Sequence, residues 1–355
     1  MDVEFTNENY REFIQNYGLN KFYEVFFVAK TSQLIELDLS YSYEFDEDSN
    51  SYSHEMMNFI AKLLISISYI TSLSLTDNNI GNEAIKDISK SLKANHILKY
   101  LNLSFNRIDN DGIKYLTESI NENLELLDIS YNIFTEIGVK YISNLLKNKS
   151  RLTDLFLGWN DICNNGIKLI TESLKFNKSL KYLDISHVGI DIEGIKFITN
   201  LLKTNKYLLF LNLESNKIGD DEAKLIFESL NYLQYINLNC NNITNKGVQY
   251  IIEVLKNPNS SLISLNLEYN GINGESIDLF IDTFKNNTTI LRFNLDIDID
   301  TDKKEYINEI LKNNRINRES QKNYLYFCTQ NKDWFFEFLE FFDIYNKPFY
   351  CICTS

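Results

Sequence analysis

Histidine, cysteine, glycine and proline are all scarce in this 355-residue chain, and their scarcity excludes several kinds of site. The three histidines, His54, His96 and His187, stand far apart, which argues against a zinc site or a histidine-based catalytic triad. The five scattered cysteines predict free thiols, not a disulfide framework. The few glycines include no phosphate-binding loop. We therefore expect no enzyme activity, no metal and no cofactor.

Positive charge and long apolar runs are also in short supply. Lysine and arginine number 35 against 49 acidic residues, so the formal net charge is −14. Such a surface repels the phosphates of nucleic acid and suits a basic protein partner. No stretch approaches the ~20 apolar residues of a membrane span. The start, Met1 to Glu4, lacks the features of a secretory signal, and we expect a cytoplasmic protein.

What the chain does contain is a repeat, marked by one asparagine per unit. The intervals between these asparagines are 28, 26, 28, 56, 25 and 29 residues, and Val188 fills the slot that halves the long one. The asparagines are Asn78, Asn106, Asn132, Asn160, Asn216, Asn241 and Asn270. A period of this length indicates a stack of equivalent units, which is an architecture that presents a surface.

Each unit combines two periodicities. The segment Leu98-x-x-Leu101-x-Leu103-x-x-Asn106 alternates in the manner of a short strand with one buried face. Apolar residues then recur three and four apart, as in Ile113, Leu116 and Ile120, which places them on one helical stripe. A small residue six positions after the asparagine, such as Gly112, allows the helix to start close to the strand layer. The asparagine itself is expected to bond the turn and its neighbour, forming a column along the stack.

This pattern resembles the leucine-rich repeat family, and its helical second half is similar to the ribonuclease-inhibitor subclass. That subclass includes the repeat domains of Ran GTPase-activating proteins and NOD-like receptors. The resemblance implies an α/β solenoid shaped as a horseshoe, with a parallel β-sheet on the concave face and α-helices on the convex face. It covers residues 34–300, about ten repeats. Residues 1–33 are then an N-terminal helical cap and residues 301–355 an aromatic-rich C-terminal helical cap. Alternatively, the aromatic run 334–342 is a docking helix for a partner.

The concave face is the predicted binding site, because the side chains beside the buried leucines point into it. Acidic and aromatic residues gather on this face. A second set of aromatic residues occupies the position just before the asparagine slot: Phe105, Tyr131, Trp159, His187 and Tyr269. The predicted contacts are Tyr100, Asp128, Asp154, Phe156, Trp159, Tyr182, Asp184, His187, Phe210, Glu214 and Tyr235. Aromatic residues in an acidic setting are typical of an interface. Alternatively, the polar residues are ordinary repeat positions and the aromatic rings only pack on their neighbours.

The sequence thus predicts an intracellular, non-enzymatic scaffold that binds a protein partner. Two alternatives follow from the resemblance. A Ran-type GTPase-activating protein needs an arginine after an early strand, for which Arg107 is the positional candidate. An inhibitor of a basic enzyme fits the acidic surface but not the low cysteine content.

Two local features have more than one interpretation. Val188 reflects either the loss of the asparagine by neutral sequence drift or a changed turn that re-aims His187. The lysines on the helices, Lys86, Lys114, Lys140, Lys168, Lys196 and Lys224, form a line that suits an acidic partner. Glutamates four residues after three of them, Glu118, Glu172 and Glu228, favour instead a self-neutralised surface. The oligomeric state is not specified by the sequence.

Overall fold

The structure is a computed structural model that describes residues 35–40, 54–66, 70–148, 151–295 and 301–320. The chain divides into two compact units, Met1–Asn216 and Lys217–Ser355. The predicted cap at residues 1–33 and the aromatic run 334–342 lie outside the described residues, so their roles stay predictions.

Strand and helix alternate through the first unit, and the strands pair in parallel in chain order. The Cα atoms of the central leucines Leu101, Leu127 and Leu155 are in register from strand to strand. The elements are β1 (Ile35–Asp38), α3 (His54–Ser66), β2 (Ile70–Ser74), α4 (Asn82–Ala94), β3 (Tyr100–Asn102), α5 (Asn110–Thr117), β4 (Leu126–Asp128), α6 (Glu136–Lys147), β5 (Asp154–Phe156), α7 (Cys163–Leu174), β6 (Tyr182–Asp184), α8 (Ile192–Leu202) and β7 (Phe210–Asn212).

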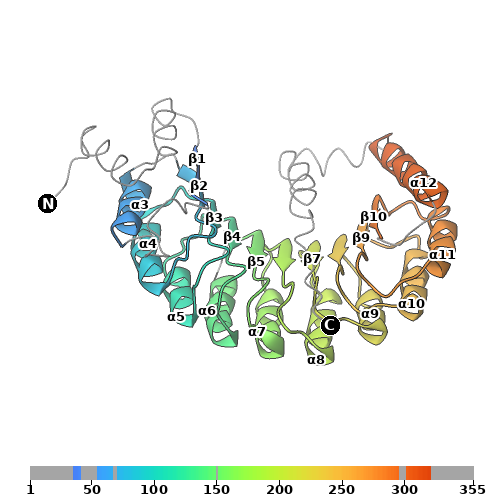
Figure 1. The fold of residues 1–355 in the computed structure, drawn as a ribbon, viewed down its shortest axis with the longest axis horizontal. Coiled ribbons are helices and arrows are strands. Elements are labelled where there is room, and N and C mark those ends of the chain that lie inside the picture. Colours follow the sequence, from blue (N-terminus) through green and yellow to red (C-terminus); the bar gives the residue numbers. More distant parts are fainter. Residues whose placement is uncertain (1–34, 41–53, 67–69, 149–150, 296–300, 321–355) are drawn as a thin grey trace. The chain divides into compact units, whose positions relative to one another are not determined.

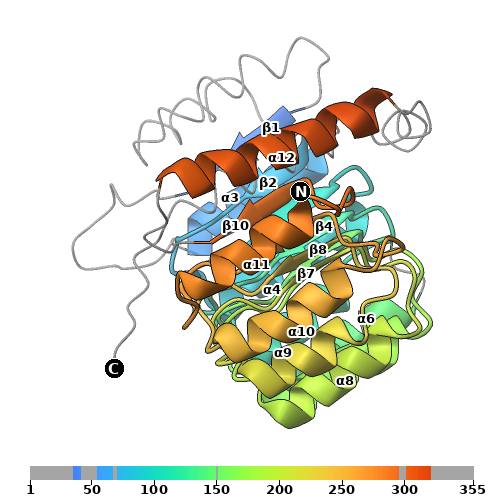
Figure 2. The ribbon, with the colours of Figure 1, turned by 90° about the vertical axis from the view of Figure 1, so that its right-hand side faces the viewer.

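The second unit continues the same alternation. Its strands also pair in parallel, β8 with β9 and β9 with β10. Its elements are α9 (Asp220–Phe227), β8 (Tyr235–Asn237), α10 (Asn245–Leu255), β9 (Ser264–Asn266), α11 (Glu275–Phe284), β10 (Arg292–Asn294) and α12 (Thr301–Ser320). The helix α12 packs beside α11, and α9, α10 and α11 lie side by side (Figure 2). The predicted α/β solenoid with parallel strands is therefore confirmed.

Within each unit the helices lie on one side of the strands (Figure 1). Parallel strands sit about 4.8 Å apart, whereas packed helices need 8–10 Å. Repeats stacked in this way therefore curve, with the strand layer on the inner side of the curve. The leucines at the centres of the strands face the helices, and Leu101, Leu127 and Leu155 are 0% exposed. We call the opposite side of the strands the sheet face.

Helix length follows the spacing of the repeat. The helices α5 and α9 have 8 residues each, and they fall in the short intervals of 26 and 25 residues. The helices of the other repeats between α4 and α11 have 10 to 13 residues. The shorter period therefore removes turns from the helix and leaves the strand and its register unchanged.

The predicted asparagine column is present. The amide Nδ2 of Asn106 donates to the carbonyls of Leu75 and Leu103, at 3.0 Å each. Its Oδ1 accepts from the backbone N–H groups of Asn78 at 3.1 Å and Ile80 at 2.9 Å. Each asparagine of this kind thus satisfies buried backbone groups of two successive repeats, which explains its fixed position.

Two further rows of asparagine were not recognised in the sequence. At the helix starts, Asn110 Oδ1 accepts from the backbone N–H groups of Thr135 at 2.9 Å and Gly138 at 2.8 Å. In the loops that return to the strands, Asn177 Nδ2 donates to the Leu146 carbonyl at 2.9 Å. Much of the asparagine content therefore has a structural role.

Candidate interaction surface

The residue before each column asparagine adopts an unusual backbone conformation. Its φ is +54° at Phe105, +52° at Tyr131, +57° at Trp159 and +47° at His187, in the left-handed region. Its N–H donates to a carbonyl of the next repeat, as from Tyr131 to Gly158 at 2.9 Å. A non-glycine residue in this region costs roughly 1–2 kcal/mol, which the surrounding turn must offset. The hydrogen bonds repeat from turn to turn, so every side chain at this position leaves the backbone in the same direction.

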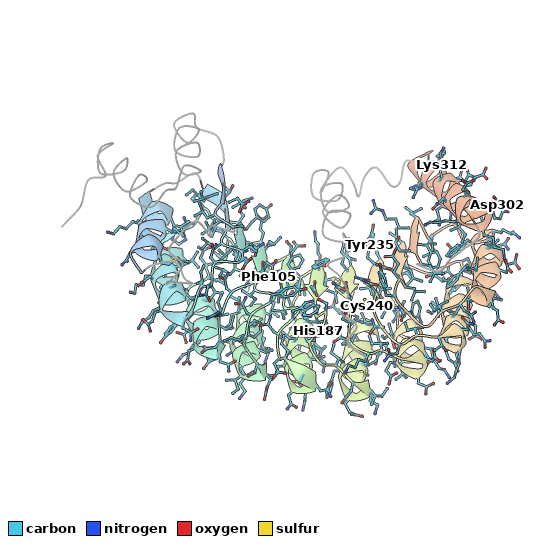
Figure 3. All side chains as sticks on the ribbon, in the orientation of Figure 1. Phe105, His187, Tyr235, Cys240, Asp302 and Lys312 are labelled. Atoms are coloured by element: carbon cyan, nitrogen blue, oxygen red, sulfur yellow. The ribbon has the colours of Figure 1, made fainter. Side chains whose placement is uncertain are left out.

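As a result, the side chains of Phe105, Tyr131, Trp159 and His187 form one continuous stack of rings. The ring centroids of Phe105 and Tyr131 are 3.8 Å apart, those of Tyr131 and Trp159 4.8 Å, and those of Trp159 and His187 3.8 Å. Successive ring planes differ by only 11° to 13°. We call these four residues the aromatic stack. Figure 3 labels its two end residues, Phe105 and His187.

The aromatic stack is accessible to solvent. Phe105 and Trp159 are each 38% exposed, and His187 is exposed as well. Two aliphatic side chains on the same edge, in the turn after β4 and the start of α6, add to this surface: Ile133 is 58% exposed and Ile137 49%. We call the edge at which the strands end and the chain turns the end-of-strand edge. Exposed apolar side chains gathered in this way are typical of an interaction surface.

The sheet face beside the aromatic stack carries two rows of predicted contact residues. In one row Phe156 lies between Asp128 and Asp184 on the neighbouring strands. In the other row Tyr182 lies between Asp154 and Phe210. The ring of Tyr182 contacts that of Phe156, with centroids 4.7 Å apart, and that of Phe210, at 6.1 Å.

The eleven predicted contact residues differ in how accessible they are. Asp154, Phe156, Tyr182, Phe210 and Tyr235 are buried, with 2% to 8% of their surface exposed. Tyr100, Asp128, Asp184 and Glu214 are half-buried, and Trp159 and His187 are exposed. Tyr235 belongs to the second unit, and the other ten belong to the first. The accessible part of the predicted site therefore lies toward the end-of-strand edge of the first unit.

The carboxylates of Asp128 and Asp184 are held in the same way. Asp128 Oδ1 accepts from the backbone N–H of Ser130 at 2.9 Å and from its hydroxyl at 2.6 Å. Asp184 Oδ1 accepts from the backbone N–H of Ser186 at 2.8 Å, and its Oδ2 accepts from Asn212 Nδ2 at 3.0 Å. Because each serine immediately precedes a ring of the aromatic stack, these bonds draw the carboxylates toward the end-of-strand edge.

Burial and mutual repulsion change the acidity of this region. Burial, with a smaller contribution from Asp184, raises the pKa of Asp128 to about 6. Burial also raises the pKa of Asp184. The pKa of the Tyr131 hydroxyl is raised by burial and by the charges of Glu214, Asp184 and Asp128. The carboxylates of the sheet face therefore act on the Tyr131 ring from its sheet side.

Gly158 gives Asp184 the space that it occupies. A Cβ at Gly158 would clash with the Ser186 hydroxyl and would lie 3.0 Å from Asp184 Oδ1. The missing side chain thus lets the Asp184 carboxylate extend over the backbone next to Trp159.

Val188 does not re-aim His187, so that interpretation of the sequence is wrong. His187 keeps the left-handed φ of its counterparts and stacks on Trp159 as they stack on one another. The backbone N–H of Val188 still donates to Asn216 Oδ1 at 3.1 Å. The side chain itself is 1% exposed, so it fills the slot of the missing asparagine with apolar contact.

The lysines on the helices are engaged by neighbouring repeats and by acidic residues. The ammonium of Lys86 lies 5.6 Å from the ring centroid of Tyr115, and that of Lys224 lies 4.9 Å from the centroid of Tyr250. Of the three expected pairs, Lys224 with Glu228 is formed, at 3.9 Å. These contacts favour the self-neutralised surface over a site for an acidic partner.

The sequence analysis placed Phe105 and Tyr131 in the position just before the asparagine but did not choose them as site residues. The signal was an aromatic residue before the asparagine slot in consecutive repeats. What the sequence did not reveal is that the shared left-handed turn would bring these rings face to face.

Comparison with known proteins identifies the repeat. Five segments match the family model described as Leucine Rich repeat, at residues 66–89, 94–116, 204–226, 229–251 and 259–280. The chain therefore contains leucine-rich repeats. No curated protein matches it. Among solved structures it is similar to Leiomodin-1 Actin-Binding Site 2 (ABS2), with 22% identity over 54% of this chain and 95% of that chain and a TM-score of 0.34.

Neither a membrane-spanning helix nor a metal-binding cluster occurs in the part of the chain that the structure describes. None of the helices described has both the length and the apolar character needed to cross a bilayer. The same residues include no group of three histidine, cysteine or acidic side chains arranged to hold a metal ion.

Proposed function

We propose that this protein is a non-catalytic interaction module that binds a protein partner at the end-of-strand edge of its first unit. Leucine-rich repeats generally mediate contacts between proteins, and the repeats here are confirmed. The observation that supports this location is the exposed aromatic stack, in which Phe105 and Trp159 keep 38% of their surface accessible. Large aromatic residues on accessible surface are typical centres of binding energy in interfaces.

The exposed rings, more than the buried row of the sheet face, provide the contact. A partner reaches Trp159 and His187 directly and the half-buried carboxylates Asp128 and Asp184 beside them. Tyr182 and Phe210 are 4% and 2% exposed, so they support the surface from below. The predicted concave-face site thereby becomes a narrower site along one edge of that face.

The length of the helices, 8 to 13 residues per repeat, supports the ribonuclease-inhibitor-like subclass. A cytoplasmic location remains an expectation from the sequence. The two alternative functions also stay predictions: Arg107 is exposed in the turn after β3, and no observation within the described residues favours either alternative over an interaction module.

The experiment compares capture by the wild-type chain with capture by two single variants. Trp159→Ala removes the centre of the aromatic stack. Phe176→Ala is the matched control, because Phe176 is an aromatic residue 80% exposed in the loop after α7, away from the end-of-strand edge. Proteins retained by the wild type and lost from Trp159→Ala are identified by mass spectrometry, purified and titrated by calorimetry.

We expect Trp159→Ala to weaken the Kd of the purified partner at least tenfold and Phe176→Ala to leave it unchanged. Trp159→Phe keeps a ring in the stack and should restore most of the affinity. If all three variants bind as the wild type does, the aromatic stack is not the binding site and the proposal fails.

A further inference from the structure

On the sheet face, the charge beside the aromatic stack has one sign. Within the described strands β3 to β7 and the two residues that follow each of them, the sheet face carries no lysine or arginine. It carries the carboxylates of Asp128, Asp154, Asp184 and Glu214. Two of these, Asp128 and Asp184, are drawn toward the stack by their hydrogen bonds to Ser130 and Ser186. The accessible rings are thus bordered on their sheet side by negative charge.

The aromatic rings and the carboxylates favour different chemistry in a segment that covers them. An apolar segment placed over Trp159 and Ile133 would bury exposed apolar surface, but it would also remove water from the nearby carboxylates without replacing it. An acidic segment would be repelled. A segment that brings positive charge with apolar stems meets both demands, because long basic side chains cover apolar surface while their heads stay polar.

Between the two basic side chains, arginine fits this surface better than lysine. Its planar guanidinium stacks on aromatic faces and donates two parallel hydrogen bonds to a carboxylate. Both faces of the Trp159 ring are covered by Tyr131 and His187, whereas His187 ends the stack and is exposed. Asp184 lies three residues before His187, so a ring and an acceptor are available within one repeat. Lysine offers a compact, strongly hydrated charge that gains less from a ring at the surface.

We propose that the aromatic stack binds a basic, arginine-containing segment of the partner protein, with an arginine lying against the stack and paired with Asp128 or Asp184. This inference rests on the proposed function and specifies the chemistry of the partner. The binding energy comes from the covered rings, and the carboxylates determine which segments are accepted. Since the carboxylates are only half-buried and the Debye length is about 8 Å at physiological salt, salt screens their attraction for the basic segment and affinity falls as salt rises.

The test uses the full-length chain and two synthetic probes, fluorescein-labelled octa-arginine and octa-lysine, measured by fluorescence anisotropy. The critical variant is Asp128→Asn combined with Asp184→Asn. The matched control is Glu83→Gln combined with Glu193→Gln, which changes the net charge equally but on the helices, where these glutamates pair with Lys86 at 3.7 Å and Lys196 at 2.5 Å. This control separates the local site from the general attraction of an acidic protein for basic peptides.

We expect octa-arginine to bind the wild type at least fivefold more tightly than octa-lysine does. The aspartate variant should lose at least tenfold in affinity for octa-arginine, and so should Trp159→Ala, while the glutamate control loses less than twofold. Equal losses in the aspartate and glutamate variants, or equal binding of the two peptides, would show that only net charge is sensed and would overturn the inference.

Failure of this inference can be distinguished from failure of the proposed function. The purified partner from the capture experiment is titrated against the same aspartate variant. If Trp159→Ala weakens partner binding but the aspartate variant does not, the stack is a binding site for a segment of other chemistry and the arginine inference falls alone. If Trp159→Ala has no effect on the partner, both fall.

Discussion

Trp159 and His187 come from consecutive repeats and stack with their ring centroids 3.8 Å apart and their planes 13° apart. Both residues hold a left-handed backbone, which is rare outside glycine and asparagine. The same turn that allows the column asparagine to reach its partners therefore also presents the preceding side chain to solvent. A structural requirement of the repeat thus creates a row of equivalent positions on which a binding surface can be built.

The interior of the aromatic stack should contribute more to stability than its end. Trp159 contacts two rings, those of Tyr131 and His187, whereas Phe105 has one ring contact within the stack, with Tyr131. Since an aromatic pair adds about 0.5–1.5 kcal/mol, Trp159→Ala should lower the free energy of unfolding by about 1–3 kcal/mol and Phe105→Ala by roughly half as much. Both side chains are 38% exposed, which matches them for burial. Urea denaturation measures the difference, and an equal loss in the two variants would contradict it.

The asparagine column should be among the least tolerant positions of the fold. Asn106→Ala leaves the buried N–H groups of Asn78 and Ile80 without the acceptor that they share at 3.1 and 2.9 Å. At about 1–3 kcal/mol for each of the two unpaired buried groups, the variant should lose about 2–6 kcal/mol. The control is Asn123→Ala, which removes one surface hydrogen bond to the His96 carbonyl and should change stability by less than about 1 kcal/mol. Thermal unfolding of the two variants tests this, and similar melting temperatures would show that the turn does not depend on the column.

Much of this fold could be predicted from the sequence because the same residue types recur at the same position in successive repeats. The leucines of the strands and the asparagine of the turn recur at fixed offsets, so chance matches are averaged out. The row at the helix starts was missed because its residues vary between asparagine and aspartate, as at Asn110 and Asp220. The row that includes Asn177 was missed because it lies in the loops between helix and strand, outside the apolar pattern. The division of the chain after Asn216 also has no counterpart in the repeat pattern.

The candidate site was less predictable, since accessibility depends on packing between repeats. Strand alternation correctly placed Phe156 and Tyr182 on the sheet face but could not show that they are 8% and 4% exposed. The stacking of Phe105 on Tyr131 depends on the left-handed φ of both residues, which cannot be predicted from the residue types at that position. Aromatic residues there are compatible with the left-handed turn only because the column holds it in place.

The glycine six residues after the column position, which is Val188 in the repeat of Gly194, should be required for space, since its backbone is helical. A Cβ at Gly194 would lie 2.5 Å from Asn164 Oδ1 of the preceding repeat. We expect Gly194→Ala to lower stability by about 1–3 kcal/mol, as overpacking does, despite the better helix propensity of alanine. Gly274 is the matched control, because it has φ −58° and a Cβ added there would meet no atom within 4 Å. At that position alanine should be neutral or raise stability by up to about 1 kcal/mol. The denaturant midpoint should therefore fall for Gly194→Ala and stay or rise for Gly274→Ala, and a drop in both would show that space is not the cause.

The raised pKa of Asp128 predicts that its charge destabilises the fold at neutral pH. The folded pKa is about 6, above the ordinary value of 3.8, so the folded state binds a proton more readily than the unfolded state between these values. Stability contributed by this group therefore falls as pH rises from about 4 through about 6, and the loss persists above that range. At about 1.4 kcal/mol per pH unit, the penalty at pH 7.5 is at most about 3 kcal/mol.

Asp128→Asn should remove this penalty without disturbing the turn. Asn102 occupies the equivalent position in the preceding repeat, where its Oδ1 accepts from the backbone N–H of Ser104 at 2.9 Å and from the Ser104 hydroxyl at 2.7 Å. An asparagine at position 128 can accept the same two bonds from Ser130. We expect the variant to be more stable than the wild type at pH 7.5, by up to about 3 kcal/mol, and equal to it near pH 4, where Asp128 is neutral in the folded state. Urea denaturation across pH 4 to 8 gives both curves.

Asp282→Asn is the control of opposite sign, because Lys285 lowers the pKa of Asp282, so its removal should not stabilise the protein at any of these pH values. A constant difference between wild type and Asp128→Asn over the whole range would mean that the charge of Asp128 is not what changes with pH.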